Sequence, residues 1–145
     1  MSKSTTAVSA WEALFRAQVS VMRYLNADFP TGELSLNEYD VLFNLSRQPH
    51  RQLRLKELNE HLLITQPSVS RLVDRLAARD YVTKSHDPDD ARGIIVQLSD
   101  EGFELFRKVA RSHIESITAR VGGSLTTEEL TTLAALCDKL RLGGA

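Results

Sequence analysis

Residues 65–79 read TQPSVSRLVDRLAAR, and this stretch decides the fold. Thr65 is a good helix cap, and Pro67 falls in the first turn, where its missing N–H costs nothing. Apolar residues then recur every three or four positions, which predicts an amphipathic helix with one buried stripe. The stripe consists of Val69, Leu72, Val73 and Leu76.

The other face of this predicted helix is polar and basic. Ser68 and Ser70 lie near its N-terminus, and Arg71 and Arg75 follow one helical turn apart. Hydroxyl and guanidinium groups donate hydrogen bonds to phosphate oxygens, so such a helix suits the groove of a nucleic acid. An ordinary surface helix has the same pattern. The sequence on either side of this stretch therefore has to distinguish a nucleic-acid-binding helix from an ordinary surface helix.

The composition is that of one globular domain. The chain has 145 residues, of which 42% are hydrophobic and 26% are charged, and its net charge is −1. A nearly neutral chain binds nucleic acid only through local charge. Residues 65–79 supply such charge, with three arginines against one aspartate. We expect a cytoplasmic protein, because no signal peptide and no apolar run of membrane-spanning length is evident.

The chain before this stretch is predicted to be helical. One helix ends near residue 28, before Phe-Pro-Thr-Gly at 29–32. Ser35 and Glu38 form a capping box for a second helix, which ends before Pro49. A short strand at 53–55 and a short helix at 56–62 then lead to residues 65–79. Two helices joined by so few residues form a helix-turn-helix.

After residues 65–79 the helical spacing of apolar residues ends. Residues 81–86 and 94–98 favour strands, and the polar residues 87–93 between them favour a loop. The resulting hairpin, placed directly after a helix-turn-helix, makes a winged helix. Ser99 then caps a long helix that ends at Gly122-Gly123, and Thr126 with Glu129 forms a capping box for the last helix.

Three segments carry a resemblance to a known family. They are Leu-Lys-Glu-Leu at 55–58, SVSRLVDRL at 68–76, and residues 87–102, where Asp90-Ala91-Arg92 looks like a wing D-x-R motif. With these motifs in order, the chain resembles the MarR family of winged helix-turn-helix transcription regulators over nearly its whole length. Two positions depart from the family pattern. Asp80 stands where glycine is common, and Lys84 stands where arginine is frequent.

The resemblance implies a mainly α fold with a small β-hairpin wing. It implies a homodimer built by an N-terminal helix within 1–34 and C-terminal helices within 99–145, with the winged helix-turn-helix at 35–98. Two such lobes would read a pseudo-palindromic operator on double-stranded DNA. It also implies a ligand-responsive regulator, most often a repressor, whose small aromatic or phenolic effector binds between the dimerisation region and the lobe. Aspartate tolerates a left-handed cap, so Asp80 should preserve the fold.

We expect the DNA contacts to come from the predicted helix and the wing. The expected contacts are Thr65, Gln66, Ser68, Ser70, Arg71, Arg75, Lys84 and Arg92. Arg92 suits a narrow minor groove, and Asp90 would orient it. Two alternatives stay open: the arginines of the helix pair with Asp74 instead, or an Asp90–Arg92 pair only stiffens the loop.

Other kinds of site receive little support. The aromatic residues Trp11, Phe15, Tyr39 and Phe43 could line a ligand pocket, but we expect them to be simple core residues. Cys137 lies on an apolar stripe, where a buried thiol is expected, and it cannot form an internal disulfide because it is the only cysteine.

No metal-ligand spacing, catalytic constellation or cofactor motif is evident, so we expect no enzyme activity, metal or cofactor. The alternative functions are a winged-helix module that binds protein instead of DNA and, less favoured, a small hydrolase.

Overall fold

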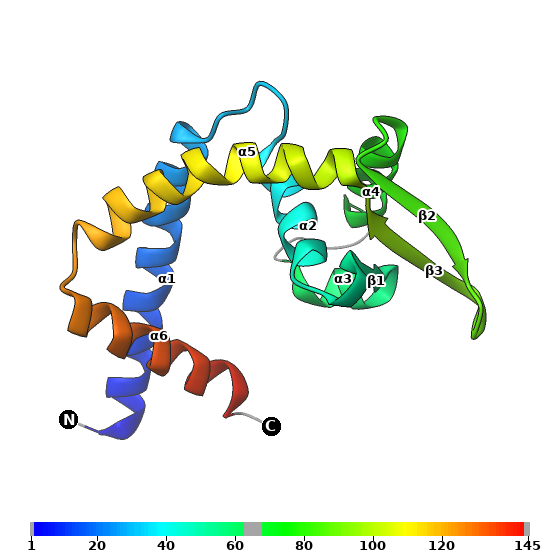
Figure 1. The fold of residues 1–145 in the computed structure, drawn as a ribbon. Helices are drawn as coiled ribbons and strands as arrows, with labels where there is room; N and C mark the ends of the chain where they lie inside the picture. Colours follow the sequence, from blue (N-terminus) through cyan, green and yellow to red (C-terminus); the bar gives the residue numbers. More distant parts are fainter. Residues whose placement is uncertain (1, 63–67, 144–145) are drawn as a thin grey trace. The chain divides into compact units, whose positions relative to one another are not determined.

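The structure is a computed structural model that describes residues 2–62 and 68–143 (Figure 1). The chain forms two compact units. One consists of Met1–Phe29 and His113–Ala145, and the other of Pro30–Ser112. Each unit is described on its own. No helix in the described part of the chain is long and apolar enough to cross a membrane.

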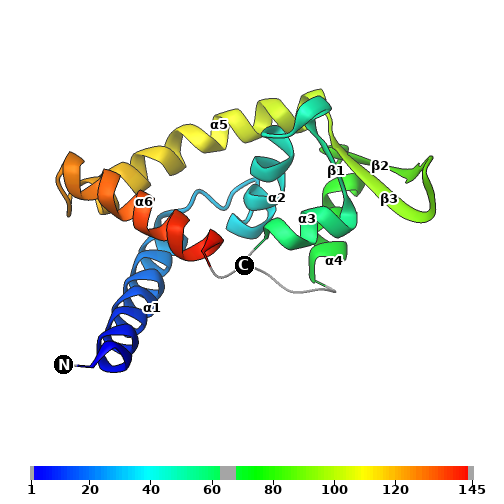
Figure 2. The same ribbon diagram turned by 90° about the horizontal axis from the view of Figure 1, so that it is seen from below.

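The Pro30–Ser112 unit is a winged helix. Its helices are α2 (Leu36–Ser46), α3 (Leu55–His61), α4 (Ser68–Ala78) and the first part of α5 (Asp100–Ile117). Its sheet is antiparallel in the order β1-β3-β2, with bounds Gln52–Arg54 for β1, Val82–Asp87 for β2 and Asp90–Leu98 for β3. Figures 1 and 2 show the β2–β3 hairpin extending away from α2 and α3. The predicted fold class is confirmed.

The predicted stripe on α4 lies in the core of this unit. Val69 and Leu76 are fully buried, and Leu72 and Val73 are nearly so. The other fully buried side chains come from α2, α3, the sheet and the segment before α2. They are Leu34, Val41, Leu42, Leu45, Leu58, Val82 and Val96. Burying each large aliphatic side chain contributes about 1.5–3 kcal/mol, so this core holds α4 in one rotation about its axis.

Local capping sets the ends of these helices. The predicted box at α2 is present, with the Glu38 N–H 3.1 Å from Ser35 Oγ and the Ser35 N–H 2.8 Å from Glu38 Oε1. Ser99 Oγ accepts from the Gly102 N–H at 3.0 Å, as expected for the cap of α5. Gly102 also permits a close approach, because a Cβ there would lie 2.1 Å from the Tyr81 carbonyl oxygen.

The end of α4 explains how the chain does without a glycine after this helix. Asp80 adopts a left-handed conformation with φ of 64°. The Tyr81 N–H donates to the Leu76 carbonyl, and the Asp80 N–H donates to the Ala77 carbonyl, each at 3.0 Å. This pair of bonds is the Schellman motif, which normally places glycine at the left-handed position. The prediction that aspartate would serve there is confirmed.

The other unit contains α1 (Lys3–Asp28), the end of α5, a π-helical turn (Thr118–Gly122) and α6 (Thr127–Leu142). The Ser2 side chain caps α1 by accepting a hydrogen bond from the Thr5 N–H. Inside the unit, the Ser116 hydroxyl donates to Asp28, and the Arg120 guanidinium donates to Ser20 Oγ at 3.1 Å. The predicted capping box of Thr126 and Glu129 at α6 is present.

Two predictions about burial in this unit were wrong. Cys137 is exposed, because no residue of α6 is buried within the chain. Trp11 and Phe15 are 60% and 52% exposed, so they do not belong to a core formed by this chain alone. Large apolar side chains of α1 and α6 therefore remain exposed in the part of the chain that the structure describes.

We predict that Asp80→Gly stabilises the protein. Glycine has no Cβ to strain at positive φ, so the free energy of unfolding should rise by about 1 kcal/mol. Asp80→Val should lower it by at least that amount, since a β-branched residue is poorly accommodated there. Urea unfolding followed by circular dichroism measures both changes. Equal stability of the two variants would contradict the left-handed assignment.

Candidate nucleic-acid interface

The exposed face of α4 carries the arginines that the sequence singled out. Because Val69, Leu72, Val73 and Leu76 turn inward, Arg71 and Arg75 are left in solvent, while Ser68 and Ser70 are half-buried. Within residues 2–62 and 68–143, no ion pair joins either arginine to a carboxylate. The alternative in which they pair with Asp74 is therefore wrong for the described structure.

Asp74 instead joins α4 to the wing. Its Oδ1 lies 2.6 Å from Lys84 Nζ on β2. We expected Lys84 to contact the DNA backbone. In the structure its ammonium group forms an ion pair with the Asp74 carboxylate. Exposed pairs of this kind contribute about 0–1 kcal/mol to stability, so the pair orients the two elements more than it stabilises them.

The wing has longer strands than predicted. The loop expected at residues 87–93 is reduced to Pro88 and Asp89, because β2 continues to Asp87 and β3 begins at Asp90. The pairing shifts between His86 and Asp87, so that the extra residues of β3 form a bulge. Short polar residues permit a loop, but the sequence pattern did not show that cross-strand pairing would continue through them.

Arg92 lies on this bulged part of β3 and is exposed. Asp90 Oδ1 accepts a hydrogen bond from the Arg92 backbone N–H at 3.0 Å. Asp90 therefore holds the backbone at Arg92 instead of its guanidinium group. No ion pair between Asp90 and Arg92 is present in the described structure, so the alternative of a merely stiffening charge pair is not supported.

An anchor at the far end of β2 was missed by the sequence reasoning. The Asp87 side chain is 1% exposed, and its Oδ2 accepts from Arg54 Nε at 2.5 Å. Its Oδ1 accepts from the Asp89 N–H at 2.9 Å. Gly93 leaves room for this carboxylate, because a Cβ there would lie 2.9 Å from Asp87 Cβ. Arg54 thereby ties the wing to the start of α3.

The sequence held one hint of this anchor. Arg54 occupies the N-cap position of α3, where Ser, Thr, Asp or Asn is usual.

The hydrogen bond from the Asp89 backbone, and then the one from Arg54, hold the pKa of Asp87 below its ordinary value. The same contact raises the pKa of Arg54. Asp87 therefore stays ionised to more acidic pH than a free aspartate.

Two expected contact residues, Thr65 and Gln66, lie outside the described residues. Of the other expected contacts, α4 carries Ser68, Ser70, Arg71 and Arg75, β2 carries Lys84, and β3 carries Arg92. Asn37, on the first turn of α2, was not singled out by the sequence. Together with Ser68, Arg71, Leu72 and Arg75 it lines a hollow of about 250 Å³.

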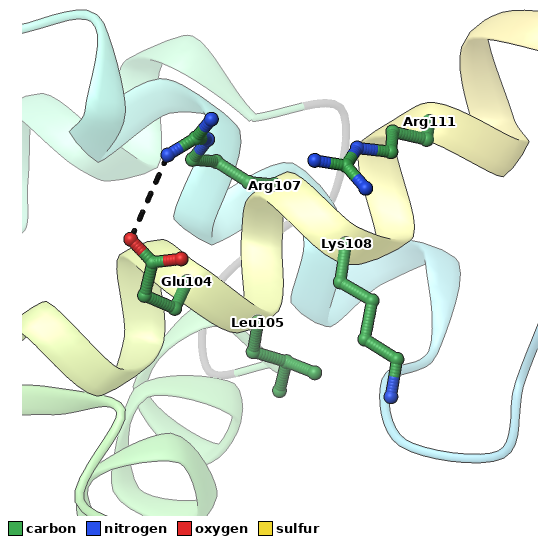
Figure 3. Close-up of a pocket in the computed structure, with 5 residues that line it drawn as sticks. All are labelled: Glu104, Leu105, Arg107, Lys108 and Arg111. Carbon is green, nitrogen blue, oxygen red and sulfur yellow. Dashed lines mark ion pairs between the residues drawn. The ribbon is translucent and has the colours of Figure 1, made fainter.

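A second hollow, of about 400 Å³, lies along α5. It is lined by Glu104, Leu105, Arg107, Lys108 and Arg111 (Figure 3). Figure 3 shows Arg107 turned toward Glu104, and their charged groups are 3.7 Å apart. Lys108 Nζ lies 3.0 Å from Glu33. Because two of its three cations are already paired, α5 is a weaker candidate for phosphate binding than α4.

The aromatic residues proposed for a ligand pocket fall into two pairs. Trp11 and Phe15 lie on α1, with ring centres 5.7 Å apart. Tyr39 and Phe43 lie on α2 in the other unit, with ring centres 6.3 Å apart. Tyr39 also stacks on Phe106 at 5.3 Å and is buried, as a core residue would be. Phe43 is half-buried.

Comparison with known proteins gives consistent results. A model of the MarR family matches residues 33–93, which includes α2 to the first part of β3. The HTH-type transcriptional regulator PecS of Dickeya dadantii (strain 3937) is 28% identical over 129 residues. That match covers 88% of this chain and 76% of PecS.

Two solved structures are similar over most of the chain. Sco3205, a MarR family transcriptional regulator from Streptomyces coelicolor solved in complex with DNA, has a TM-score of 0.81 and 26% identity and covers 99% of this chain and 89% of its own. BpsR of Bordetella bronchiseptica has a TM-score of 0.76 and 27% identity and covers 90% of this chain and 91% of its own. The BpsR structure concerns regulation of its DNA binding by 6-hydroxynicotinic acid.

We predict that the Asp87 anchor makes stability depend on acidic pH. Because its folded-state pKa is depressed, Asp87 stabilises the fold fully above the unfolded value of about 4, and this contribution is lost as pH falls through the folded-state pKa. Asp87→Asn should therefore be less stable than the parent at neutral pH, and the difference should shrink in acid.

Urea unfolding at a series of pH values measures this difference. Asp89→Asn is the matched control, since the Asp89 side chain is 82% exposed and its oxygen lies 3.9 Å from Arg54. The control should follow the parent at every pH. A constant gap between Asp87→Asn and the parent down to strongly acidic pH would show that the anchor does not act through ionised Asp87.

Proposed function

We infer that this chain is a DNA-binding transcription regulator of the MarR family, and we propose that it acts as a homodimer on a pseudo-palindromic operator, from which a small ligand releases it. We further propose that the bound dimer represses transcription. The observation that carries the DNA-binding role is the exposed face of α4, where Arg71 and Arg75 have no carboxylate partner in the described structure.

We assign the DNA contacts to α4 and the wing. Ser68, Ser70, Arg71 and Arg75 would meet base edges and phosphates in the major groove, and Thr65 and Gln66 are proposed contacts just before them. Arg92 would enter the adjacent minor groove from the wing. Lys84 would contact the backbone, and Asp74 would hold it in place until it does.

Exposed apolar side chains support the dimer. On α1 they are Val8, Trp11 and Phe15, and on α6 they are Leu133, Leu136, Leu140 and Leu142. A soluble monomer rarely leaves so many large apolar groups uncovered on two helices. We propose that residues 1–34 and 99–145 pair with those of a second copy. Twofold symmetry would then place two lobes about 34 Å apart, one turn of DNA.

The ligand would act by mass action. A molecule that prefers the dimer in a state unable to bind DNA shifts the population away from the operator, by no more than its difference in affinity for the two states. We propose a small aromatic or phenolic effector, and the similarity to BpsR supports this class. Our candidates for its recognition are the rings of Trp11, Phe15 and Phe43, which keep exposed surface, whereas Tyr39 is buried against Phe106.

The alternative, a winged-helix module that binds protein instead of DNA, is not favoured. The similarity to Sco3205, which was solved with DNA, covers nearly the whole chain.

We predict that Arg71→Ala and Arg92→Ala each weaken binding to the chain's own upstream DNA by about tenfold or more, because each removes a contact to a phosphate or a base edge. Fluorescence anisotropy over a range of salt concentrations measures the affinities. Arg107→Ala is the matched control, since it also removes one positive charge but from α5, and it should change affinity by less than about twofold. Parental affinity in both test variants would show that the assigned site is wrong.

We predict that Leu136→Glu breaks the dimer. Leu136 is 59% exposed in the single chain, and twofold symmetry would bury two copies of the new charge. The dissociation constant of the dimer should rise by about a hundredfold or more. Thr131→Glu, on the opposite side of α6, is the control and should leave a dimer.

Sedimentation equilibrium distinguishes these outcomes for the parent and both variants. A parent that is monomeric throughout the accessible concentration range would contradict the proposed dimer. A Leu136→Glu variant as tightly dimeric as the parent would move the interface away from this face of α6.

A further inference from the structure

The hollow between α2 and α4 brings together donors from two helices. Asn37 lies on the first turn of α2, whereas Ser68, Arg71 and Arg75 lie on α4. The described residues that line it carry two positive charges and no carboxylate, and Leu72 forms the apolar part of the lining. A cavity with this lining has the chemistry of an anion site.

The spacing of the two arginines favours such an anion. Arg71 and Arg75 are four residues apart on one helix, so their side chains are neighbours, and like charges at this spacing repel. The nearest acidic residue in the sequence, Asp74, is held by Lys84 at 2.6 Å. An oxyanion seated between the guanidinium groups would relieve the repulsion and accept several hydrogen bonds.

Asn37 supplies a neutral donor on the opposite side of the hollow. In the described structure, the Ser35–Glu38 capping box satisfies its own members and does not involve the Asn37 side chain. Its amide NH₂ group carries two donors. Side-chain amides are frequent contacts of phosphate oxygens at protein–DNA interfaces, where they fix the register of the protein on the duplex.

We propose that this hollow seats one phosphate of the DNA backbone and that Asn37 is a contact residue that fixes the position of α4 in the groove. This inference rests on the proposed DNA-binding function and adds to it a residue outside the helix-turn-helix pair. Because the contact is to the backbone, it contributes affinity equally on every sequence and carries no base preference of its own.

The test uses Asn37→Asp in the full-length protein. The carboxylate keeps the shape of the amide but repels a phosphate, and an acidic residue in the first turn of a helix favours folding. Affinity should fall by about tenfold or more, by the same factor on the upstream duplex and on an unrelated duplex. Asn37→Ala, which only removes the donors, should lose about three- to tenfold.

A control variant separates the site from the change in net charge. Thr131→Glu also adds one negative charge, but at an exposed position of α6 in the other unit of the chain, and it should bind within about twofold of the parent. Thermal unfolding by circular dichroism verifies that each variant is folded. If Asn37→Asp binds DNA like Thr131→Glu while the parent shows salt-dependent binding, the phosphate seat is wrong and the proposed function stands.

Chemically modified DNA identifies the seated phosphate. Uncharged methylphosphonate linkages, placed one at a time along each strand, should include one position per half-site that weakens the parent by about tenfold. The same position should weaken Asn37→Asp less than the parent, because removing the phosphate charge also removes its repulsion by the new carboxylate. A position that costs both proteins equally would overturn the assignment to Asn37. A parent that binds no duplex at all would instead refute the proposed function itself.

Discussion

The apolar stripe of α4 is almost completely removed from solvent, and the orientation of every polar group on that helix follows from this burial. Val69 and Leu76 have no exposed surface. Rotating α4 by a quarter turn would bring Arg71 or Arg75 toward the core, where an unpaired charge costs several kcal/mol. The core therefore selects one rotation, and in that rotation both arginines face solvent and line one hollow with Ser68 and with Asn37 of α2. A face suited to phosphate is thus a consequence of packing on the opposite side.

Charge is distributed so that a nearly neutral protein still presents a basic face. The net charge is −1, and a broad positive field is absent. Several acidic residues close to the proposed interface are engaged with the protein's own cations or backbone. Asp74 pairs with Lys84, Asp87 binds Arg54, and Asp90 accepts from the Arg92 backbone. These contacts orient the wing and also keep the carboxylates away from Arg71 and Arg75, so affinity depends on placement more than on total charge.

Sequence reasoning predicted the local features well and the long-range ones poorly. The stripe of α4, the capping boxes and the left-handed Asp80 depend on residues a few positions apart, and all are present. The Arg54–Asp87 anchor joins residues 33 positions apart, and nothing in either local pattern indicates its partner. The exposure of Cys137 and Trp11 was missed for another reason: a periodic apolar stripe shows that a face will be covered, but not whether the same chain covers it. The roles of the individual contact residues are still predictions, because they depend on DNA.

A narrow basic face has a consequence for regulation, given the proposed dimer. Few phosphate contacts per lobe mean that one lobe alone binds weakly and loses affinity quickly as salt rises. Tight binding then requires both lobes at once, since the second lobe binds at the high effective concentration that the first one creates. That gain disappears when the geometry forbids simultaneous contact. A ligand therefore needs only to favour a state with the wrong lobe spacing, and it need not touch α4 or the wing. The residues proposed to bind a ligand therefore need not be those proposed to bind DNA.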